Sequence, residues 1–350
     1  MKDLSPDLRE GLILSFAIDL ARGINCRRAS HISKNTINQY LKAAASFSLG
    51  AGLPDPRFQT NALGIQISST YFPDLQNWLS FLEKWDGPSD KAWALDLNIL
   101  KSLCHISSSQ PFLSNKAAVT DAIILACHTG SRSCEYCKGT TRKGEIFSRV
   151  PSNYHTKEWA GQPIALIASD LTFLDHSKHV VEPSKATTTA QYVQITFRFD
   201  KGGGGNFNTR TFRRLDQDPS LCPIRASTRL LTRWSLLGKD PSFPICCYLP
   251  RHGSQVAVIS SQQVTDSLKE AVIAAYPDPT HLYRRHIRLF RSHSVRVFAC
   301  CTLVACGLKD EIIEHKLRWC SSAWKTYIRE SFAEVDATSL QLFQSSLTDE

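Results

Sequence analysis

The sequence predicts a mainly helical α+β protein with a small antiparallel sheet and two domains. Three observations lead to this prediction. Apolar residues recur at helical spacing through residues 1–107, β-branched and aromatic residues alternate through 164–175 and 191–215, and helical spacing returns from about residue 223. A chain of 350 residues is long enough for two domains.

The first part of the chain is expected to be helical throughout. One helix begins after Ser5, which is a good N-cap followed by proline, and a second occupies residues 33–52 and ends in glycine. Further helices are expected around residues 74–86 and 91–105. These four segments predict a helical first domain.

The stretch SSSQPFLSNKA, residues 107–117, is the best candidate for a linker between domains because it is rich in serine and contains proline. We therefore expect one domain over residues 1–112 and a second over residues 113–350. No internal repeat is visible in either part.

The second domain is predicted to begin with a buried helix that ends at a Thr-Gly turn, followed by a second helix near Arg132. Residues 139–163 are polar and rich in Gly, Pro and Thr, so they predict a long loop. The four glycines at 202–205 indicate the tip of a hairpin between two strands.

The charge of the chain is positive and unevenly distributed. The net charge is +9, and residues 1–112 carry 11 Lys and Arg against 10 Asp and Glu, so most of the excess lies in residues 113–350. The stretch 281–296, HLYRRHIRLFRSHSVR, holds five arginines, three histidines and no acid. This distribution favours a polyanionic partner over an uncommitted basic surface.

Composition argues against several other classes of protein. No apolar run approaches the ~20 residues that a membrane span needs, and the N-terminus lacks a signal-peptide pattern. We expect an intracellular protein without a membrane partner, located in the nucleus if its source is a eukaryote. Twelve cysteines include one CxxC, Cys134 to Cys137, without a second half for a zinc site, so neither a metal nor a cofactor is expected.

His293 and Arg296 lie three residues apart at the start of the apolar run that follows them. Ser292 is a suitable N-cap, which would place both side chains on one face of the first helical turn. A helix start with a guanidinium and an imidazole is a candidate site for an anion such as phosphate. The plainer alternative is that both residues cap a core helix.

Five residues together have the chemistry of phosphoryl transfer without a metal: Arg132, Lys201, His293, Arg296 and Tyr327. Arginines stabilise the charge of the transition state, a tyrosine hydroxyl can attack phosphorus, and a lysine and a histidine can move protons. Taken singly, each has a plainer interpretation. Lys201 can be a turn residue, and Tyr327 can belong to a core stripe.

The sequence resembles the tyrosine recombinases, the phage-integrase-like enzymes that break and rejoin DNA. The resemblance rests on HTGSRSCEY around Arg132, on HSVR at residues 293–296, and on GLKDEIIEHKLRWCSSAWKTYIRE at residues 307–330. The Trp-then-Tyr spacing of the last segment looks most like recombinases of DIRS-type and Crypton-type mobile elements. The resemblance covers about residues 113–335, while residues 1–107 are similar to the family's core-binding domain in pattern alone.

The resemblance implies a role for each matching residue. Arg132 and Arg296 match the two arginines that bind the scissile phosphate. Lys201 matches the hairpin lysine that acts as general acid, with Lys138 and Lys143 as alternatives for that role. His293 matches the histidine of the His-x-x-Arg motif.

Three further matches complete the implied site. Trp319 matches a His or Trp position that hydrogen-bonds the phosphate or supports the pocket. Tyr327 matches the nucleophile, with Tyr276 and Tyr283 as alternatives in the same domain. Glu135 matches an acidic residue that supports the active site.

The sequence also departs from the family pattern. Leu317 stands where a glycine is usual, residues 139–163 look like an insertion, and the glycine run 202–205 is unusual beside the expected lysine. These departures are compatible with a divergent active enzyme or with a decaying one.

The implied function is site-specific recombination or integration of a mobile element. The enzyme would cut and rejoin double-stranded DNA through a 3′-phosphotyrosyl intermediate, as a homo-oligomer on paired sites, with no cofactor and no metal. The amphipathic stretch 339–347 could dock on a neighbouring subunit or form a frayed tail. The alternatives are a catalytically inactive DNA-binding relative and a type IB topoisomerase-like enzyme, whereas a metal-dependent nuclease is disfavoured because the motifs contain no clustered carboxylates.

Overall fold

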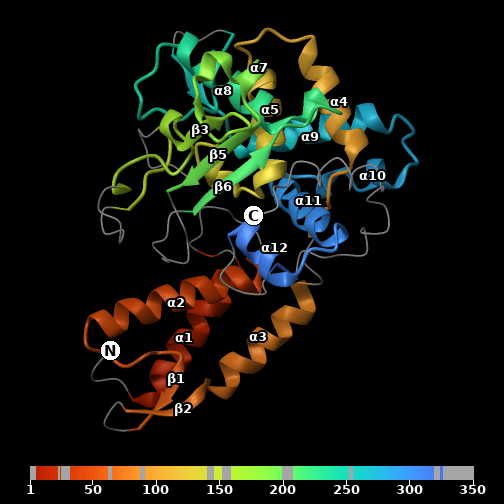
Figure 1. Cartoon of the computed structure of the whole chain (residues 1–350). Coiled ribbons are helices and arrows are strands. Elements are labelled where there is room, and N and C mark those ends of the chain that lie inside the picture. Colours follow the sequence, from red (N-terminus) through yellow and green to blue (C-terminus); the bar gives the residue numbers. More distant parts are fainter. Residues whose placement is uncertain are drawn as a thin grey trace. The chain divides into compact units, whose positions relative to one another are not determined.

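The computed structural model describes residues 5–22, 24, 32–61, 65–86, 91–139, 146–151, 159–198, 208–251, 255–318 and 324–325. The chain divides into two compact units, residues 1–90 and 91–350. Figure 1 shows that the first contains three helices and a hairpin, while the second gathers helices around a small sheet. The protein is therefore of the mainly helical α+β class, as the sequence predicts.

The elements follow the chain in this order. The first unit contains α1 (Pro6–Ala21), α2 (Lys34–Gly50), β1 (Phe58–Thr60), β2 (Gln66–Tyr71) and α3 (Pro73–Asp86). The second unit begins with α4 (Leu97–Ser108), α5 (Asn115–Thr129), α6 (Ser133–Tyr136), η2 (Ala168–Asp170), β3 (Leu171–Leu174), β4 (Val180–Val181), η3 (Pro183–Lys185) and α7 (Ala186–Thr189). It continues with β5 (Tyr192–Phe197), β6 (Asn208–Arg213), η4 (Pro219–Leu221), α8 (Pro223–Leu236), β7 (Cys247–Tyr248), β8 (Ala257–Val258), α9 (Ser261–Ala275), α10 (Leu282–Arg285), η5 (Ile287–Leu289), α11 (Ser292–Ala305) and α12 (Asp310–Leu317).

The first unit confirms the predicted helices and corrects one expectation. Ser5 caps α1, accepting a hydrogen bond from the Leu8 amide at 3.4 Å. However, β1 and β2 pair as antiparallel strands in a part of the chain where only helices were expected. The β2 sequence QISSTY is rich in β-branched and aromatic residues, which suit a pleated surface better than a helix.

The division between the units lies between Asp90 and Lys91, and not at the expected boundary after residue 112. Helix α4, assigned to the first domain from sequence, packs in the second unit through its buried residues Ile99, Leu100 and Leu103. The serine-rich stretch that suggested a linker contains the α4–α5 connection. A polar connection between two helices of one core resembles a domain linker in composition.

Helix α5 is the centre of the second unit. Every residue from Ala117 to Thr129 is buried, because α4, α8, α9 and α11 all contact the helix. A helix surrounded on all sides is apolar around its whole circumference, and ILAC has this character. Figure 1 shows α5 between α8 and α4.

The sheet of the second unit is antiparallel, with strand order β4-β3-β5-β6. Strand β5 alternates as the sequence predicts, burying Val193, Ile195 and Phe197 on the side that joins the core. Ile195 pairs with Arg210 and Phe197 with Asn208, so β5 and β6 form the expected hairpin. Its predicted glycine tip lies outside the described residues.

Candidate functional site

The turn between α5 and α6 brings the first predicted arginine to its position. Gly130 closes α5 in the left-handed conformation, with φ of 58°, and a Cβ at this residue would collide with the side chain of Leu317. Glycine is therefore needed both for its backbone conformation and for close packing against α12. The turn places Arg132 immediately before α6 and beside the end of α12.

Arg132 and Glu135 form a local pair. The Arg132 amide donates to Glu135 Oε2 at 2.7 Å, and its guanidinium Nη1 lies 3.3 Å from Oε1. The Glu135 side chain is 2% exposed and the Arg132 side chain is 28% exposed. The carboxylate thus holds both the backbone amide and the guanidinium of an arginine whose side chain is partly open to solvent.

Besides Arg132, an arginine that the sequence did not indicate, Arg318, binds the Glu135 carboxylate. Arg318 Nη2 lies 2.7 Å from Glu135 Oε2, and its guanidinium lies over the Phe197 ring, 3.3 Å from the centroid. Arg318 has φ of 56°, an uncommon conformation for a residue other than glycine. Its position directly before Trp319 in the sequence was the only available signal.

The end of α12, next to Arg318, is tied to the sheet. Arg210 on β6 donates to the His315 carbonyl oxygen through Nε at 2.9 Å and through Nη2 at 2.6 Å. This carbonyl oxygen lies in the last turn of α12 and also accepts from the Arg318 amide at 3.2 Å, so Arg210 adds two charged donors at the C-terminal end of the helix. The contact fixes the segment leading to Trp319 relative to the β5–β6 hairpin.

Arg296 comes from α11 and reaches the same turn as Arg132. Its Nη1 donates to the Gly130 carbonyl oxygen at 2.5 Å, and its Nη2 donates to the Leu317 carbonyl oxygen at 3.3 Å. Arg296 is 3% exposed. The guanidinium therefore joins the α5–α6 turn, α11 and the end of α12.

The start of α11 differs from the sequence prediction by one residue. Ser292 is the first helical residue and Arg291 is the N-cap, with the Arg291 amide donating to Ser294 Oγ at 3.1 Å. Ser294 takes the capping role because it can reach back to that amide from the third helical position. His293 is exposed while Arg296 is buried, so the two side chains differ in environment although they lie one turn apart.

Two further observations indicate that the Arg132 and Arg296 segments converge. Tyr136 on α6 donates from its hydroxyl to the Ser292 carbonyl oxygen at 3.3 Å. Burial raises the pKa of the Cys134 thiol and Glu135 adds to the rise, while the charges of Arg132 and Arg296 oppose it. Both guanidinium groups therefore act on one thiol between them, which stays neutral at neutral pH.

Counting the described groups, the site combines the guanidinium groups of Arg132, Arg296 and Arg318 with the single carboxylate of Glu135. Its local charge is positive, because burial of one acid among three arginines leaves an excess of cations. Such an arrangement attracts an oxyanion and stabilises negative charge that develops on it.

Three predicted site residues, Lys201, Trp319 and Tyr327, lie outside the described residues, and their roles remain predictions. A described residue shortly before Tyr327 in the sequence is informative. Trp324 is buried, its Nε1 donates to Glu314 Oε1 at 3.1 Å, and its carbonyl oxygen accepts from Cys300 Sγ at 3.6 Å. Cys300 lies one helical turn after Arg296, so the segment that leads to Tyr327 is anchored beside the candidate site.

The alternative residues considered for these roles have other environments. Tyr276 donates its hydroxyl hydrogen bond to Asp96 and stacks on His281, and Tyr283 is buried against Trp93. Both tyrosines belong to the packing of α9 and α10 with the segment before α4. Lys138 is exposed, and Lys143 lies outside the described residues.

Among the described residues, no three His, Cys, Asp or Glu side chains come together as a metal site. Over the same residues, no helix has the length and apolar character needed to cross a bilayer.

No model of a protein family matches the chain, and no curated protein matches it. Several solved structures are similar to the chain. A lambda integrase dimer bound to a COC′ core site has a TM-score of 0.44 at 14% identity, with 96% of this chain and 83% of that chain covered. The Tn1549 transposon integrase in complex with transposon right end DNA has a TM-score of 0.47 at 11% identity, covering 95% and 82%. The XerH site-specific recombinase bound to a palindromic difH substrate, in a post-cleavage complex, has a TM-score of 0.47 at 13% identity, covering 97% and 72%.

Proposed function

We propose that this protein is a site-specific DNA recombinase of the tyrosine type, encoded by a mobile element of the DIRS or Crypton kind. It cuts and rejoins double-stranded DNA through a 3′-phosphotyrosyl intermediate and needs neither a metal nor a cofactor. The observation that carries the proposal is the meeting of Arg132, Arg296 and the end of α12 at the Gly130 turn, as the resemblance implies.

The two predicted arginines have distinct tasks at this meeting point. Arg132 is partly exposed and is oriented by Glu135, so its guanidinium is available to a phosphodiester that approaches from solvent. Arg296 is held by two carbonyl oxygens, and it adds a fixed positive charge beneath the phosphate. Charge that is fixed before the reaction stabilises the transition state without reorganisation during it.

Tyr327 is the proposed nucleophile. It lies three residues after the anchored Trp324, and three residues span at most about 10 Å. A free tyrosine has a pKa of about 10, so the positive charge of the arginines favours its deprotonated, attacking form.

The remaining roles follow the resemblance. Lys201 protonates the leaving 5′ oxygen, His293 accepts or hands on a proton, and Trp319 supports the phosphate. The first unit, residues 1–90, grips DNA together with the catalytic part of the chain, and several protomers assemble on paired sites. Phosphate contacts from the basic excess after residue 112 supply much of the affinity.

Covalent capture tests the proposal and does not require a defined target sequence. A pool of nicked duplexes with a randomised central region is incubated with the full chain in excess chelator, and complexes that survive detergent are recovered and sequenced. We expect a recovered consensus site and no covalent complex from the Tyr327→Phe variant, which keeps the fold and loses only the hydroxyl.

The other outcomes identify the alternatives. Specific binding without covalent product would make the protein an inactive DNA-binding relative. Relaxation of supercoiled plasmid without a sequence preference would favour the type IB topoisomerase-like enzyme. Cleavage that requires magnesium would contradict the mechanism.

A further inference from the structure

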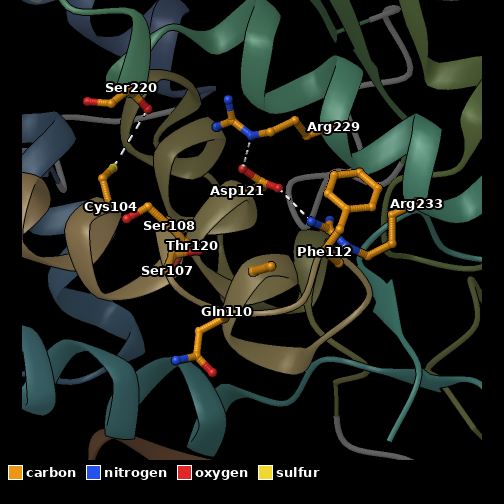
Figure 2. A pocket seen from close by; sticks show the side chains of 11 residues that line it. Cys104, Ser107, Ser108, Gln110, Phe112, Thr120, Asp121, Ser220, Arg229 and Arg233 are labelled. Carbon is orange, nitrogen blue, oxygen red and sulfur yellow. Dashed lines mark hydrogen bonds and ion pairs between the residues drawn. The ribbon is translucent and has the colours of Figure 1, made fainter.

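Helix α8 carries arginines at positions 225, 229 and 233, four residues apart and therefore along one side of the helix. Two of them bind one carboxylate of α5: Arg229 Nε lies 2.6 Å from Asp121 Oδ1, and Arg233 Nη2 lies 2.8 Å from Asp121 Oδ2. Figure 2 shows the two guanidinium groups converging on Asp121. The two arginines together carry more positive charge than the single carboxylate of Asp121 can neutralise.

Arg233 has an unusual environment. It is 0% exposed, and its Nε donates to the Phe112 carbonyl oxygen at 2.8 Å. Its Nη1, also buried, has no hydrogen-bond partner among the described residues. Because Asp121 is shared by Arg229 and Arg233, it leaves part of the buried Arg233 charge uncompensated.

Arg233 and Arg229 line a cavity of about 310 Å³. This volume lies in the range of small-molecule sites. Besides Asp121, the hydroxyl-bearing residues Ser107 and Thr120 line the cavity. Figure 2 shows these residues around the opening between α4, α5 and α8.

The charge of the lining favours an anion. Asp121 is the only carboxylate among the lining residues, against two arginines. Cys104, at the edge, has its thiol pKa raised to about 11 by burial, so it adds no negative charge at neutral pH. Arg233 Cζ lies 4.7 Å from the centroid of the Phe112 ring, so the guanidinium covers one face of that ring. Phe112 is still 38% exposed, which leaves ring surface for an apolar or flat group.

We propose that this cavity binds a small phosphate-bearing molecule, with its oxyanion on the partly exposed guanidinium of Arg229, the buried charge of Arg233 behind it, and a flat ring against Phe112. The site is separate from the candidate catalytic site. Asp121 precedes Gly130 by nine residues of the buried helix α5, about 14 Å at 1.5 Å per residue. The proposal therefore does not depend on the recombinase function.

Adenosine monophosphate is the probe for this site. Inorganic phosphate and adenosine are measured for comparison, and the ionic strength is held constant. Binding to the full chain is measured by calorimetry and by the thermal midpoint. We expect adenosine monophosphate to bind and to raise the midpoint, inorganic phosphate to bind more weakly, and adenosine to have no effect. The Arg229→Met variant should lose at least about tenfold in affinity, a loss in keeping with removal of one charged hydrogen bond.

Two matched variants make the test specific. Arg225→Met removes the same charge from the same helix outside the cavity lining and should change affinity by less than about threefold, because charges at a distance are screened by solvent and salt. Arg132→Met should leave binding unchanged. Equal binding of adenosine, no binding of either phosphate compound, or loss of binding in Arg132→Met would overturn the proposal. The first two results would mean that the cavity does not select a phosphate, and the third that the anion occupies the catalytic site. Arg229 is 36% exposed, so its replacement should preserve the fold.

Discussion

Two buried carboxylates, Asp121 and Glu135, are each held by two arginines, yet their partners come from different parts of the chain. Asp121 binds Arg229 and Arg233, one turn apart on α8. Glu135 binds Arg132 from its own turn and Arg318 from beyond α12.

The difference shows what each cluster can do. Each cluster has one buried arginine and one that is partly exposed, Arg229 beside Asp121 and Arg132 beside Glu135. The Asp121 cluster joins two neighbouring helices beside a cavity, whereas the Glu135 cluster joins the α5–α6 turn to the segment before the predicted nucleophile. Joining distant segments around a partly exposed guanidinium is what the proposed phosphodiester site requires, so the two similar ion pairs differ in their proposed functions.

The largest expected effect is on the rate of DNA cleavage, and it should distinguish the Glu135 cluster from helix α8. Arg132→Ala should lower the rate of DNA cleavage by about 10²–10³-fold, the loss typical of removing one group that stabilises transition-state charge. The measurement is single-turnover formation of the covalent complex on the captured site. Arg225→Ala on α8 is the matched control and should cleave at the normal rate. Equal losses in both variants would mean that the effect is general electrostatic attraction to DNA.

Stability should not separate the clusters. Asp121→Asn leaves the fully buried Arg233 without a counter-charge, and Glu135→Gln does the same to Arg318, whose side chain is 2% exposed. Each substitution should therefore cost about 3–5 kcal/mol of unfolding free energy. Urea denaturation measures both. A loss below about 1 kcal/mol in either variant would contradict the structural importance given to that carboxylate.

His128 lies on α5 between the two carboxylates and gives the helix a pH dependence. Burial lowers its pKa from 6.5 to about 4, and its Nε2 lies 2.9 Å from the Leu221 carbonyl oxygen. The unfolded chain therefore binds a proton that the folded chain excludes, and stability should fall as pH drops from 6.5 towards 4, by about 3 kcal/mol. Denaturation of the wild type and of His128→Gln at several pH values measures this. The variant should have a shallower slope, and identical slopes would assign the dependence to other groups.

The smallest expected effect concerns the exposed basic segment before α11. Arg285→Ala should weaken DNA binding several-fold and make the salt slope shallower by about 0.9, the value for one phosphate contact. Binding measured over a range of salt concentrations tests this. Lys239, which is partly exposed in the α8–β7 connection, provides the control: a slope change in Lys239→Ala and none in Arg285→Ala would place the DNA elsewhere.

The two clusters also differ in how far sequence alone could predict them. Arg132 and Glu135 are three residues apart after a glycine turn, so local spacing and motif indicate them together. Arg318 could not be assigned, because its contact with Glu135 depends on how α12 packs against Gly130. Asp121 appears within an apolar run, and nothing in that run indicates that α8 supplies two arginines to it.

The same distinction applies to the fold. Patterns within one element predicted the helix from Ser5, the buried helix α5 and the β5–β6 hairpin. The first-unit strand pair was not predicted because both strands are short and β2 is largely exposed. The domain boundary differs from the expected one because the core position of α4 depends on distant partners. The N-cap of α11 was misplaced by one residue because Ser292 and Ser294 are both suitable by type.

The most direct test of the proposed mechanism is the identity of the residue that becomes bonded to DNA. The covalent complex formed on the captured site is digested with protease and nuclease, and the modified peptide is sequenced by mass spectrometry. The account predicts a 3′-phosphonucleotide on Tyr327 and no modified peptide from Tyr327→Phe. Modification of Tyr276 or Tyr283, or an adduct that persists in Tyr327→Phe, would contradict it.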